Sequence, residues 1–353
     1  MIQPDAPDTR PSRQTLPWAQ DGTGAPCSRI SRRTVMIGGS LAAAGLAAYP
    51  VIREFIGPRA AAFVARAADY GGPLVQIVRD GLLATGLDYR QLRGKRVLLK
   101  PNLVEPSQGA PHMTTHPAVV LAAAEVFRRW GARVQVGEGP GHVRDTEMAL
   151  VESGLSKPLR QERLTFVDLN YDDVVWRENR GGRSPLRGFF FPRAVAEADL
   201  VVSLPKLKTH HWVGVTAAMK NLYGLLPGVQ YGWPKNVLHH AGIPETVFDI
   251  NATVNNTVAI VDAIDCMEGD GPIMGTPRHL GLLLVGTNLP AVDATACRLM
   301  QIDARRVPYL RIAADQLGPI CERRIEQRGE DWQPLAQRFE ILDVPHLRGL
   351  RTT

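Results

Sequence analysis

The sequence predicts an α/β fold with a mainly parallel sheet, helices on both faces and a small β-hairpin insertion. Short apolar runs rich in β-branched residues, such as residues 96–99 and 200–204, alternate with longer segments of helical spacing. A helix of about 15 residues between two such strands is typical of a parallel sheet with right-handed crossovers. The chain has 353 residues, of which 44% are hydrophobic, and this content is sufficient for a full core.

The start of the folded region allows two interpretations. Residues 74–78 have the composition of a strand, but residues 75–87 also fit a helix, and both interpretations remain open. Further along the chain, Thr115 or His116 can cap a helix in which Pro117 occupies the first turn. The other predicted strands are residues 96–99, 133–136, 164–169, 199–204, 258–261, 280–285 and, at an edge, 323–330. The predicted helices are residues 117–130, 147–154, 244–256, 288–300 and 307–317.

Two segments depart from this alternation of strands and helices. Residues 174–191 contain two short β-rich runs around Gly181 and Gly182, which predicts a β-hairpin insertion. Residues 225–241 are rich in Gly, Pro, Trp and His, and we interpret them as a lid. The sequence contains no internal repeat, and we expect a single α/β domain over residues 71–344.

The amino-terminal part of the chain predicts export. Residues 1–30 are rich in proline and poor in large apolar side chains, so we expect a disordered leader. Arg32 and Arg33 directly precede a weakly hydrophobic segment, and residues 31–62 therefore match a twin-arginine (Tat) export signal. The glycines and Pro50 make this segment a poor membrane span, although an uncleaved amino-terminal anchor remains open. We expect export across the cytoplasmic membrane to the periplasm or cell envelope. The expected partner is the Tat machinery, with membrane contact only through this segment.

The charge distribution and the cysteine spacing argue against two classes of function, nucleic acid binding and iron-sulfur cluster binding. The formal net charge is +6, but no long basic run is interleaved with aromatic residues, so a nucleic acid partner is not expected. The four cysteines form no C-x-x-C pair and have no iron-sulfur spacing. We therefore do not expect an iron-sulfur cluster within this chain.

Polar side chains directly follow several predicted strands. These groups are Lys100, Asn102, Glu138, Lys206, Lys208 and Asp262. Because the carboxyl ends of parallel strands lie along one edge of a sheet, we expect these groups to gather there although they are far apart in sequence. Lysines at this edge, together with Lys220 in the next helical segment, would supply cationic donors for a carboxylate or phosphate. The alternative is that the lysines simply face solvent.

The densest cluster of polar groups is expected in a loop. Pro205 ends the strand at residues 200–204, and Lys206, Lys208, His210 and His211 follow within a few residues. A cationic loop between a buried strand and a helix is where open α/β sheets hold anionic ligands. We therefore expect this loop to be the centre of the site.

Catalytic and metal-binding residues are also proposed from residue type. Glu138 or His210 is the candidate for acid–base chemistry. Asp262 and Glu268 could supply oxygen ligands for a divalent metal, although no H-E-x-x-H spacing is present. Nitrogen ligands could come from His116, His142, His210, His211, His239 and His240. The cofactor is therefore unknown, and a divalent metal remains open. The alternative is that these histidines cap helices or form hydrogen bonds within loops.

Seven motifs occur in an order that resembles one known family. They read V-L-L-K-P-N, T-H-P, V-G-E-G-P-G, L-V-V-S-L-P-K-L-K-T-H, M-K-N-L-Y-G, V-D-A-I-D-C-M-E-G-D-G-P and L-P-A-V-D-A-T-A. Over most of residues 96–317 the chain resembles the microbial family known as domain of unknown function 362. Some members of that family carry a ferredoxin-like cluster domain, which suggests a redox setting, but this chain lacks the cysteine runs of such a domain.

The resemblance marks motif positions without giving roles, so the roles remain hypotheses. The motif positions are Lys100, Asn102, His116, Glu138, Lys206, Lys208, His210, Lys220, Asn221, Asp262, Glu268 and Asp293. We assign substrate binding to Lys100, Asn102, His116, Lys206, Lys208, Lys220 and Asn221, catalysis to Glu138 and His210, and metal binding to Asp262 and Glu268. The resulting prediction is an exported enzyme that binds an anionic small molecule, with metal assistance left open. The alternatives are a non-catalytic cofactor or ligand carrier and a redox accessory protein of an iron-sulfur system.

Overall fold

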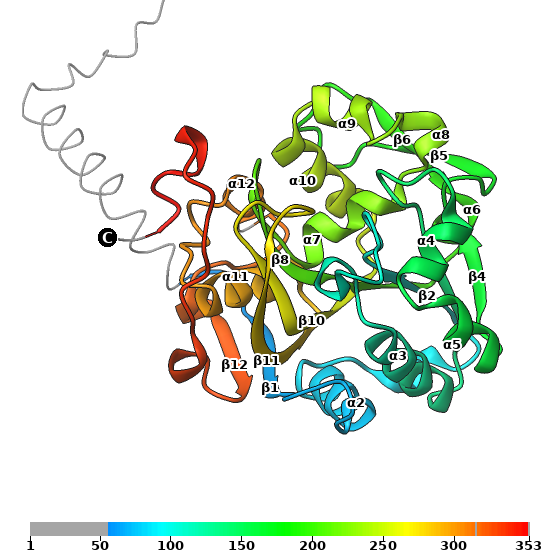
Figure 1. The fold of residues 1–353 in the computed structure, drawn as a ribbon, viewed down its shortest axis with the longest axis horizontal. Helices are drawn as coiled ribbons and strands as arrows, with labels where there is room; N and C mark the ends of the chain where they lie inside the picture. Colours follow the sequence, from blue (N-terminus) through cyan, green and yellow to red (C-terminus); the bar gives the residue numbers. More distant parts are fainter. Residues whose placement is uncertain (1–55, 315, 352–353) are drawn as a thin grey trace, which may run out of the picture. The chain divides into compact units, whose positions relative to one another are not determined.

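A ten-stranded sheet with helices packed on it forms the centre of the described region (Figure 1). The structure is a computed structural model that describes residues 56–314 and 316–351. The predicted leader at residues 1–30, and the predicted export segment as far as residue 55, lie outside the described residues. None of the described helices is both long and apolar enough to cross a membrane.

The strands and helices follow one another along the chain in the alternation expected of an α/β fold. The strands are β1 (Ala60–Arg66), β2 (Arg96–Pro101), β3 (Arg133–Glu138), β4 (Thr165–Asp168), β5 (Val174–Glu178), β6 (Gly188–Pro192), β7 (Leu200–Leu204), β8 (Lys206–His210), β9 (Gly214–Thr216), β10 (Thr257–Glu268), β11 (Thr276–Gly286) and β12 (Ile325–Gly329). The helices are α2 (Leu74–Ala84), α3 (Pro117–Arg129), α4 (Thr146–Glu152), α5 (Ser156–Gln161), α6 (Arg193–Ala196), α7 (Ala218–Asn221), α8 (Gly228–Tyr231), α9 (Asn236–His240), α10 (Ile243–Thr253), α11 (Leu289–Leu299) and α12 (Pro308–Ala313).

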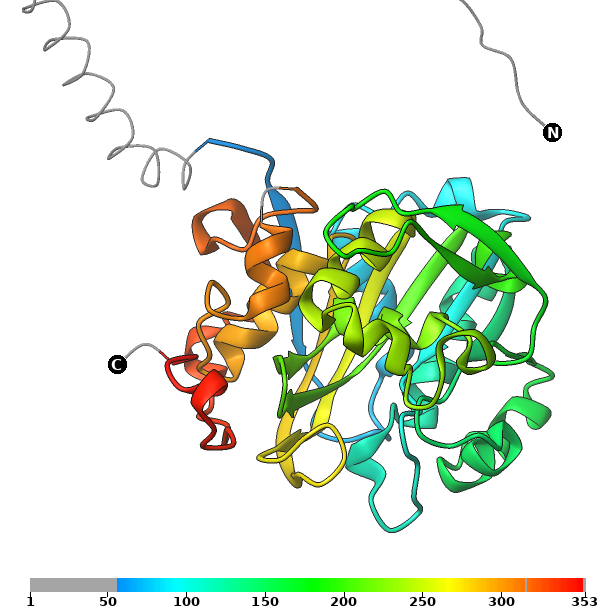
Figure 2. The same ribbon diagram turned by 90° about the horizontal axis from the view of Figure 1, so that it is seen from above.

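The main sheet is mostly parallel. Its strands run in the order β12-β1-β11-β10-β7-β2-β3-β4, and β8 extends the sheet by pairing with β10 and β9. Along the main order, the antiparallel pairs are those that β11 makes with β1 and with β10, and the remaining neighbours are parallel. Figure 2 shows these strands side by side. The prediction of a mainly parallel α/β sheet is therefore confirmed.

Helices bury both faces of the sheet. Helices α2 and α3 pack on one face, and α7 and α11 pack on the other, with α10 next to α7 and α12 next to α10 and α11 (Figure 1). Successive residues of a strand point to opposite faces, and in β2 the side chain of Leu98 joins one hydrophobic cluster while Val97 and Leu99 join the other. The near-continuous apolar runs of β2, β7 and β10 are explained by burial on both sides.

The structure decides two points at the start of the domain. Residues 74–84 form helix α2, which packs against α3 and β11, so the helical interpretation of this segment is the correct one. Strand β1 at residues 60–66 belongs to the main sheet, where it pairs with β11 and β12. The sheet therefore includes residues that precede the domain start expected at residue 71.

The prediction of a loop at residues 206–211 is wrong, because residues 206–210 form strand β8. Pro205 lacks an N–H group and interrupts the ladder, but its carbonyl accepts a hydrogen bond from Asp262 N at 2.9 Å. Strand β10 has twelve residues, so its first part pairs with β7 and its later part pairs with β8. The chain therefore continues in an extended conformation beyond Pro205, along the same neighbouring strand.

The two irregular segments of the sequence have distinct structures. Strands β5 and β6 form a separate antiparallel two-stranded sheet, which confirms the predicted hairpin insertion. Residues 225–241, predicted to be a lid, contain the short helices α8 and α9. Both helices contribute buried side chains, Tyr231 and Leu238, to the hydrophobic cluster on the α7 face.

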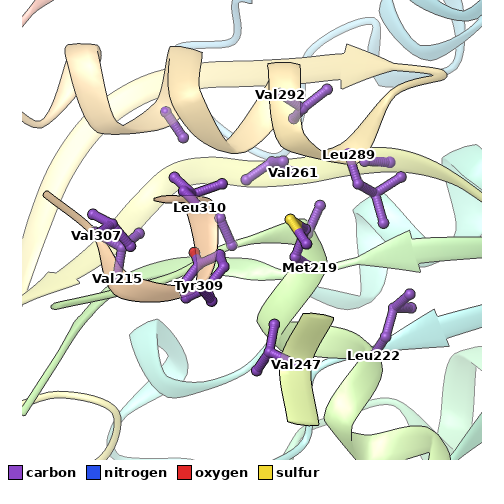
Figure 3. Close-up of a cluster of buried hydrophobic side chains, with 14 of the residues drawn as sticks. Val215, Met219, Leu222, Val247, Val261, Leu289, Val292, Val307, Tyr309 and Leu310 are labelled. Atoms are coloured by element: carbon purple, nitrogen blue, oxygen red, sulfur yellow. The ribbon is translucent and has the colours of Figure 1, made fainter. Parts of the chain in front are cut away.

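Helix α7 is held in place by a buried apolar layer and by one carboxylate. Met219 and Leu222 lie within a cluster of side chains from β10, α10, α11 and α12 (Figure 3). Asp293 of α11 accepts hydrogen bonds from the backbone N–H groups of Ala218 at 2.7 Å and Met219 at 3.0 Å. The start of α7, and with it the position of Lys220, is therefore fixed by the core.

Loss of packing in this layer should destabilise the whole fold. Leu222 is fully buried, and a Leu222→Ala substitution is expected to reduce the free energy of unfolding by about 2–5 kcal/mol, because it leaves a cavity. Urea denaturation followed by circular dichroism measures the change. The control is Met274→Ala, since Met274 is 76% exposed and its truncation is expected to change stability by less than about 0.5 kcal/mol. Equal effects of the two substitutions would contradict the packing described here.

Candidate functional site

A cavity of about 270 Å³ lies at the carboxyl ends of β2 and β3, between β8, α7 and the segment 225–241. Its wall combines three lysines, four histidines and one carboxylate: Lys100, Lys220, Lys235, His142, His210, His211, His239 and Glu138. We call this cavity the lysine pocket. Six residues predicted from the sequence line it, namely Lys100, Asn102, Glu138, His210, Lys220 and Asn221.

A buried ion pair forms one wall of the lysine pocket. Lys100 Nζ donates hydrogen bonds to Glu138 Oε2, to the carbonyl of Pro101 at 2.8 Å and to Asn221 Oδ1 at 3.0 Å. Burial lowers the pKa of Lys100 and raises the pKa of Glu138, so burial opposes the charge on both partners. A proton can therefore be held by either group at modest cost, which suits acid–base chemistry.

Asn221 connects this ion pair to the sheet. Its Nδ2 donates to the carbonyl of Lys100 at 3.0 Å and to Ser203 Oγ at 3.1 Å, and its Oδ1 accepts from Asn102 Nδ2 at 3.2 Å. These bonds join α7 to the ends of β2 and β7. Asn102 Oδ1 has no hydrogen-bond partner among the described residues, and the same is true of Thr216 Oγ1 in the pocket wall. A buried polar atom without a partner costs roughly 1–3 kcal/mol, so a bound molecule that supplied a partner would be stabilised.

Gly224 packs directly on the ion pair. A Cβ atom at this position would clash with Glu138 Oε1 and would lie 2.6 Å from Lys100 Nζ. The carbonyl of Gly224 also accepts a hydrogen bond from Gly139 N at 3.3 Å. The glycine of the M-K-N-L-Y-G motif is therefore explained by close approach of the backbone to the Lys100–Glu138 pair.

Lys220 differs from the other lysines of the pocket. Its Nζ lies 4.0 Å from the centre of the Tyr223 ring and has no hydrogen-bond or ion-pair partner in the described part of the chain. Desolvation by the surrounding protein and the nearby charge of Lys100 lower the pKa of Lys220 to about 7. Both the ammonium and the neutral amine are therefore populated near neutral pH.

Two histidines of the pocket, His210 and His239, are neutral at pH 7. Burial and the charge of Lys220 lower the pKa of His210 well below its usual range, and they lower the pKa of His239 to about 4. His210 Nδ1 accepts a hydrogen bond from Trp212 N at 3.1 Å, which leaves Nε2 as the protonated ring nitrogen. The His239 ring stacks on Tyr223 with 5.7 Å between ring centres. A neutral imidazole can donate a hydrogen bond to a ligand without adding positive charge to the pocket.

A second buried cluster lies outside the lysine pocket. Lys206 Nζ donates to Asp262 Oδ2 at 2.6 Å and to the Tyr70 hydroxyl at 2.8 Å, and Tyr70 donates to Asp262 Oδ1 at 3.1 Å. His116 N donates to Asp262 Oδ2 at 2.9 Å, and its ring stacks on Tyr70. His116 Nδ1 accepts from Ala118 N at 3.1 Å, as the helix cap expected for α3. This cluster ties β8, β10 and the start of α3 together.

Lys208 is subject to the positive charges of lysines from both clusters. Its Nζ donates to the carbonyls of Met113 at 2.6 Å and Pro272 at 3.2 Å, without a carboxylate partner. Burial, followed by the charges of Lys206 and Lys220, lowers its pKa well below the usual range. The side chain is fully buried, and Lys208 is not one of the residues that line the pocket.

The two residues proposed as metal ligands are engaged separately. Asp262 is paired with Lys206, whereas Glu268 accepts from Glu340 N at 2.9 Å and lies 3.7 Å from the guanidinium of Arg278. Within residues 56–314 and 316–351, no three His, Cys, Asp or Glu side chains are arranged to hold a metal ion. The donors present therefore do not fit a divalent metal at the predicted position.

Lys235 is not among the site residues predicted from the sequence, but it lines the pocket from the segment 225–241. Its Nζ donates to Asn170 Oδ1 at 2.9 Å and to the carbonyl of Leu226 at 2.5 Å, and burial lowers its pKa to about 7. His239, from the same segment, also lines the pocket. The available signal was Lys235 itself, which is the one lysine in a segment rich in Gly, Pro, Trp and His.

A larger cavity of about 560 Å³ lies elsewhere, around Arg298, Trp332 and Arg338. None of the residues predicted as a site from the sequence lines it. The lysine pocket is therefore the candidate site supported by both the motifs and the geometry.

Comparison with known proteins agrees with the motif order. Residues 97–298 match the family described as Domain of unknown function (DUF362). The chain belongs to the DUF362 family. This DUF362 protein is 30% identical over 232 residues to a thylakoid-associated protein of Synechocystis sp., and the alignment covers 64% of this chain and 68% of that protein.

Among solved structures, a similarity is found to the lactate racemase apoprotein from Thermoanaerobacterium thermosaccharolyticum. The TM-score is 0.43 at 14% identity, and the match covers 70% of this chain and 58% of that chain. The DUF362 protein therefore spans somewhat more than half the length of this structural relative.

A side chain at position 224 should disrupt the ion pair of the pocket. Gly224→Ala is expected to lower the free energy of unfolding by about 1–3 kcal/mol, because the methyl group displaces Glu138 or Lys100. Denaturation with urea measures this loss. Gly72→Ala serves as the control, since its nearest neighbouring atom would lie 3.8 Å away. Unchanged stability in Gly224→Ala would show that the backbone does not approach the pair so closely.

Breaking the second cluster should be more costly than removing a surface pair. Asp262→Ala is expected to cost about 3–5 kcal/mol of stability, because it leaves Lys206 buried without a counter-ion. The double variant Lys206→Met, Asp262→Leu should recover most of that loss. Asp80→Ala, which removes the exposed pair with Arg79, should cost less than about 1 kcal/mol. Thermal and urea unfolding distinguish these cases, and a mild effect of Asp262→Ala would argue against a structural role.

Proposed function

We propose that this DUF362 protein is an exported enzyme that binds a small anionic molecule in the lysine pocket. The observation that carries the proposal is the balance of charge around the pocket. Lys100, Lys220 and Lys235 line it, and Glu138 is the one carboxylate among its described lining residues. Burying positive charge without a counter-ion is unfavourable, and a bound anion would offset that cost.

Lys220 is the group that an anion would contact most favourably. Lys100 and Lys235 already donate to protein acceptors, whereas Lys220 Nζ has none among the described residues. Contact with the Tyr223 ring holds the amine within the wall of the pocket. A charge-assisted hydrogen bond from Lys220 to a carboxylate or phosphate oxygen would be stronger than a neutral one.

Acid–base groups beside this amine favour an enzyme over a carrier. The Lys100–Glu138 pair can release or accept a proton, and the neutral ring of His210 borders the same cavity. A cavity of about 270 Å³ suits a small molecule rather than a nucleotide-sized one. A ligand carrier remains the outcome to expect if ligands bind without being converted.

Export is proposed from the sequence and from one relative. The arginine pair at residues 32–33 supports passage through the Tat machinery to the periplasm or cell envelope. The related protein of Synechocystis sp. is described as thylakoid-associated, which supports a place at a membrane. A lysine substitution of the arginine pair in the full chain, followed by cell fractionation, tests the proposal. Unchanged export of this variant would contradict it.

Removing the amine of Lys220 should weaken anion binding. Lys220→Met is expected to raise the dissociation constants for sulfate, phosphate and pyruvate roughly 10- to 100-fold, because a charge-assisted hydrogen bond contributes about 1.5–3 kcal/mol. Isothermal titration calorimetry measures the binding. Lys157→Met, an exposed change on α5, is the matched control and should bind like the parent chain. If none of these anions binds, or if both variants bind equally, the pocket assignment is wrong. Conversion of a bound ligand, followed by NMR, separates an enzyme from a carrier.

Anion binding should weaken as pH rises through 7. The pKa of Lys220 is about 7, so the ammonium that attracts an anion is complete near pH 6 and is lost above pH 7. The affinity for sulfate, whose charge is constant in this range, should fall by up to about tenfold per pH unit between pH 7 and 9. Lys235 also has a pKa of about 7, so Lys220→Met and Lys235→Met are compared. A pH dependence that survives in Lys220→Met and disappears in Lys235→Met would assign the effect to Lys235.

A further inference from the structure

We infer that Lys220 is a nucleophile that forms a Schiff base with a small carboxylate bearing a carbonyl group, such as a 2-oxo acid. This inference rests on the proposed function, because it takes the lysine pocket as the anion site. It goes beyond that function by assigning a covalent step and the chemical class of the ligand.

The first argument is the freedom of the Lys220 amine. Lys220 is half-buried, whereas the fully buried lysines at this end of the sheet use their N–H groups as donors to fixed acceptors: Lys100, Lys206, Lys208 and Lys235. Hydrogen bonds to fixed acceptors favour the ammonium form and orient the nitrogen toward the protein, so a carbonyl group could react with such an amine only after displacing them. Lys220 Nζ has no such acceptor in the described region and rests on an aromatic face. Its lone pair is therefore available once the proton leaves.

The second argument is that both protonation states of Lys220 are accessible at neutral pH. Desolvation and the neighbouring Lys100 lower its pKa to about 7. Desolvation beside another cation is a recognised way to make a lysine nucleophilic. The ammonium form can attract the carboxylate, and the neutral form can attack the carbonyl carbon.

The third argument is that the backbone beneath Lys220 is fixed. Asp293 binds the N–H groups of Ala218 and Met219, and Asn221 is bonded to the ends of two strands. The buried layer of Figure 3 packs on the other side of the same helix. A nucleophile on such a support keeps its position relative to a bound carbonyl group.

The reaction balances without an added oxidant or reductant. The amine nitrogen attacks the carbonyl carbon, and a proton moves from nitrogen to oxygen to give a carbinolamine. Loss of one water molecule then forms the carbon–nitrogen double bond, and the protonated imine keeps the positive charge beside the carboxylate. His210, which is neutral with its Nε2 protonated, and the Lys100–Glu138 pair border the pocket and can supply and recover the protons.

Reductive trapping tests the inference. The purified chain is incubated at pH 7 with pyruvate or glyoxylate and sodium cyanoborohydride, which reduces an imine to a stable secondary amine. Intact mass spectrometry and peptide mapping should find one adduct, on Lys220. Surface lysines, whose ordinary pKa is about 10.4, are almost fully protonated at this pH and should react at least tenfold more slowly. Lys220→Met should lose the adduct, whereas Lys157→Met should retain it.

The possible failures are distinguishable. Binding of pyruvate by calorimetry without any adduct would overturn the nucleophile but leave the anion pocket intact. Adducts of equal yield in Lys220→Met and the parent chain would likewise overturn the assignment to Lys220. If no small anion binds in calorimetry, the proposed function fails, and this inference fails with it. A circular dichroism spectrum identical to that of the parent chain confirms that Lys220→Met has folded.

Discussion

The burial of lysine amines at the carboxyl ends of the strands is the constraint on which this structure depends. Lys100, Lys206 and Lys208 are among the largest fully buried side chains of the described chain. An ammonium taken out of water needs acceptors, which here come from Glu138 on β3, Asp262 on β10 and backbone carbonyls in the connecting segments. The need to provide hydrogen-bond acceptors for these three amines therefore determines how closely the strand ends and the loops beyond them approach one another.

The same need for acceptors explains why one amine of the lysine pocket differs from the others. Protein acceptors form hydrogen bonds or ion pairs with the amines of the other lysines. The amine of Lys220 contacts only the face of the Tyr223 ring among the described residues. The polar network of Asn221 and the apolar layer around Met219 lie on opposite sides of α7, so the helix is held from both. A reactive or ligand-binding amine on a short helix would otherwise lack a defined position, since four residues form little helix by themselves.

Much of the fold could be predicted because the buried strands are apolar runs with clear ends. The gathering of Lys100, Asn102 and Glu138 followed from the rule that parallel strands end at one edge. The separation of the Lys206–Asp262 pair from the pocket could not be predicted, because it depends on which strand is the neighbour and in which register. Proline after β7 suggested a loop, yet the length of β10 allowed pairing to continue as β8. The hydrogen-bond partners of Lys235 are Asn170, which is distant in sequence, and the carbonyl of Leu226. No local sequence pattern predicts these bonds.

The unequal construction of the two sides of the cavity has a consequence for how related proteins diversify. One side is β8, whose backbone is bonded to β10 and β9 and whose alternate residues serve the core. The other is residues 225–241, made of two short helices outside the sheet. Outside core side chains such as Tyr231 and Leu238, substitutions on the helical side can reshape the space for a ligand without breaking the hydrogen bonds of the sheet. Variation in ligand preference among homologous chains should therefore concentrate there, while the strand side stays nearly constant.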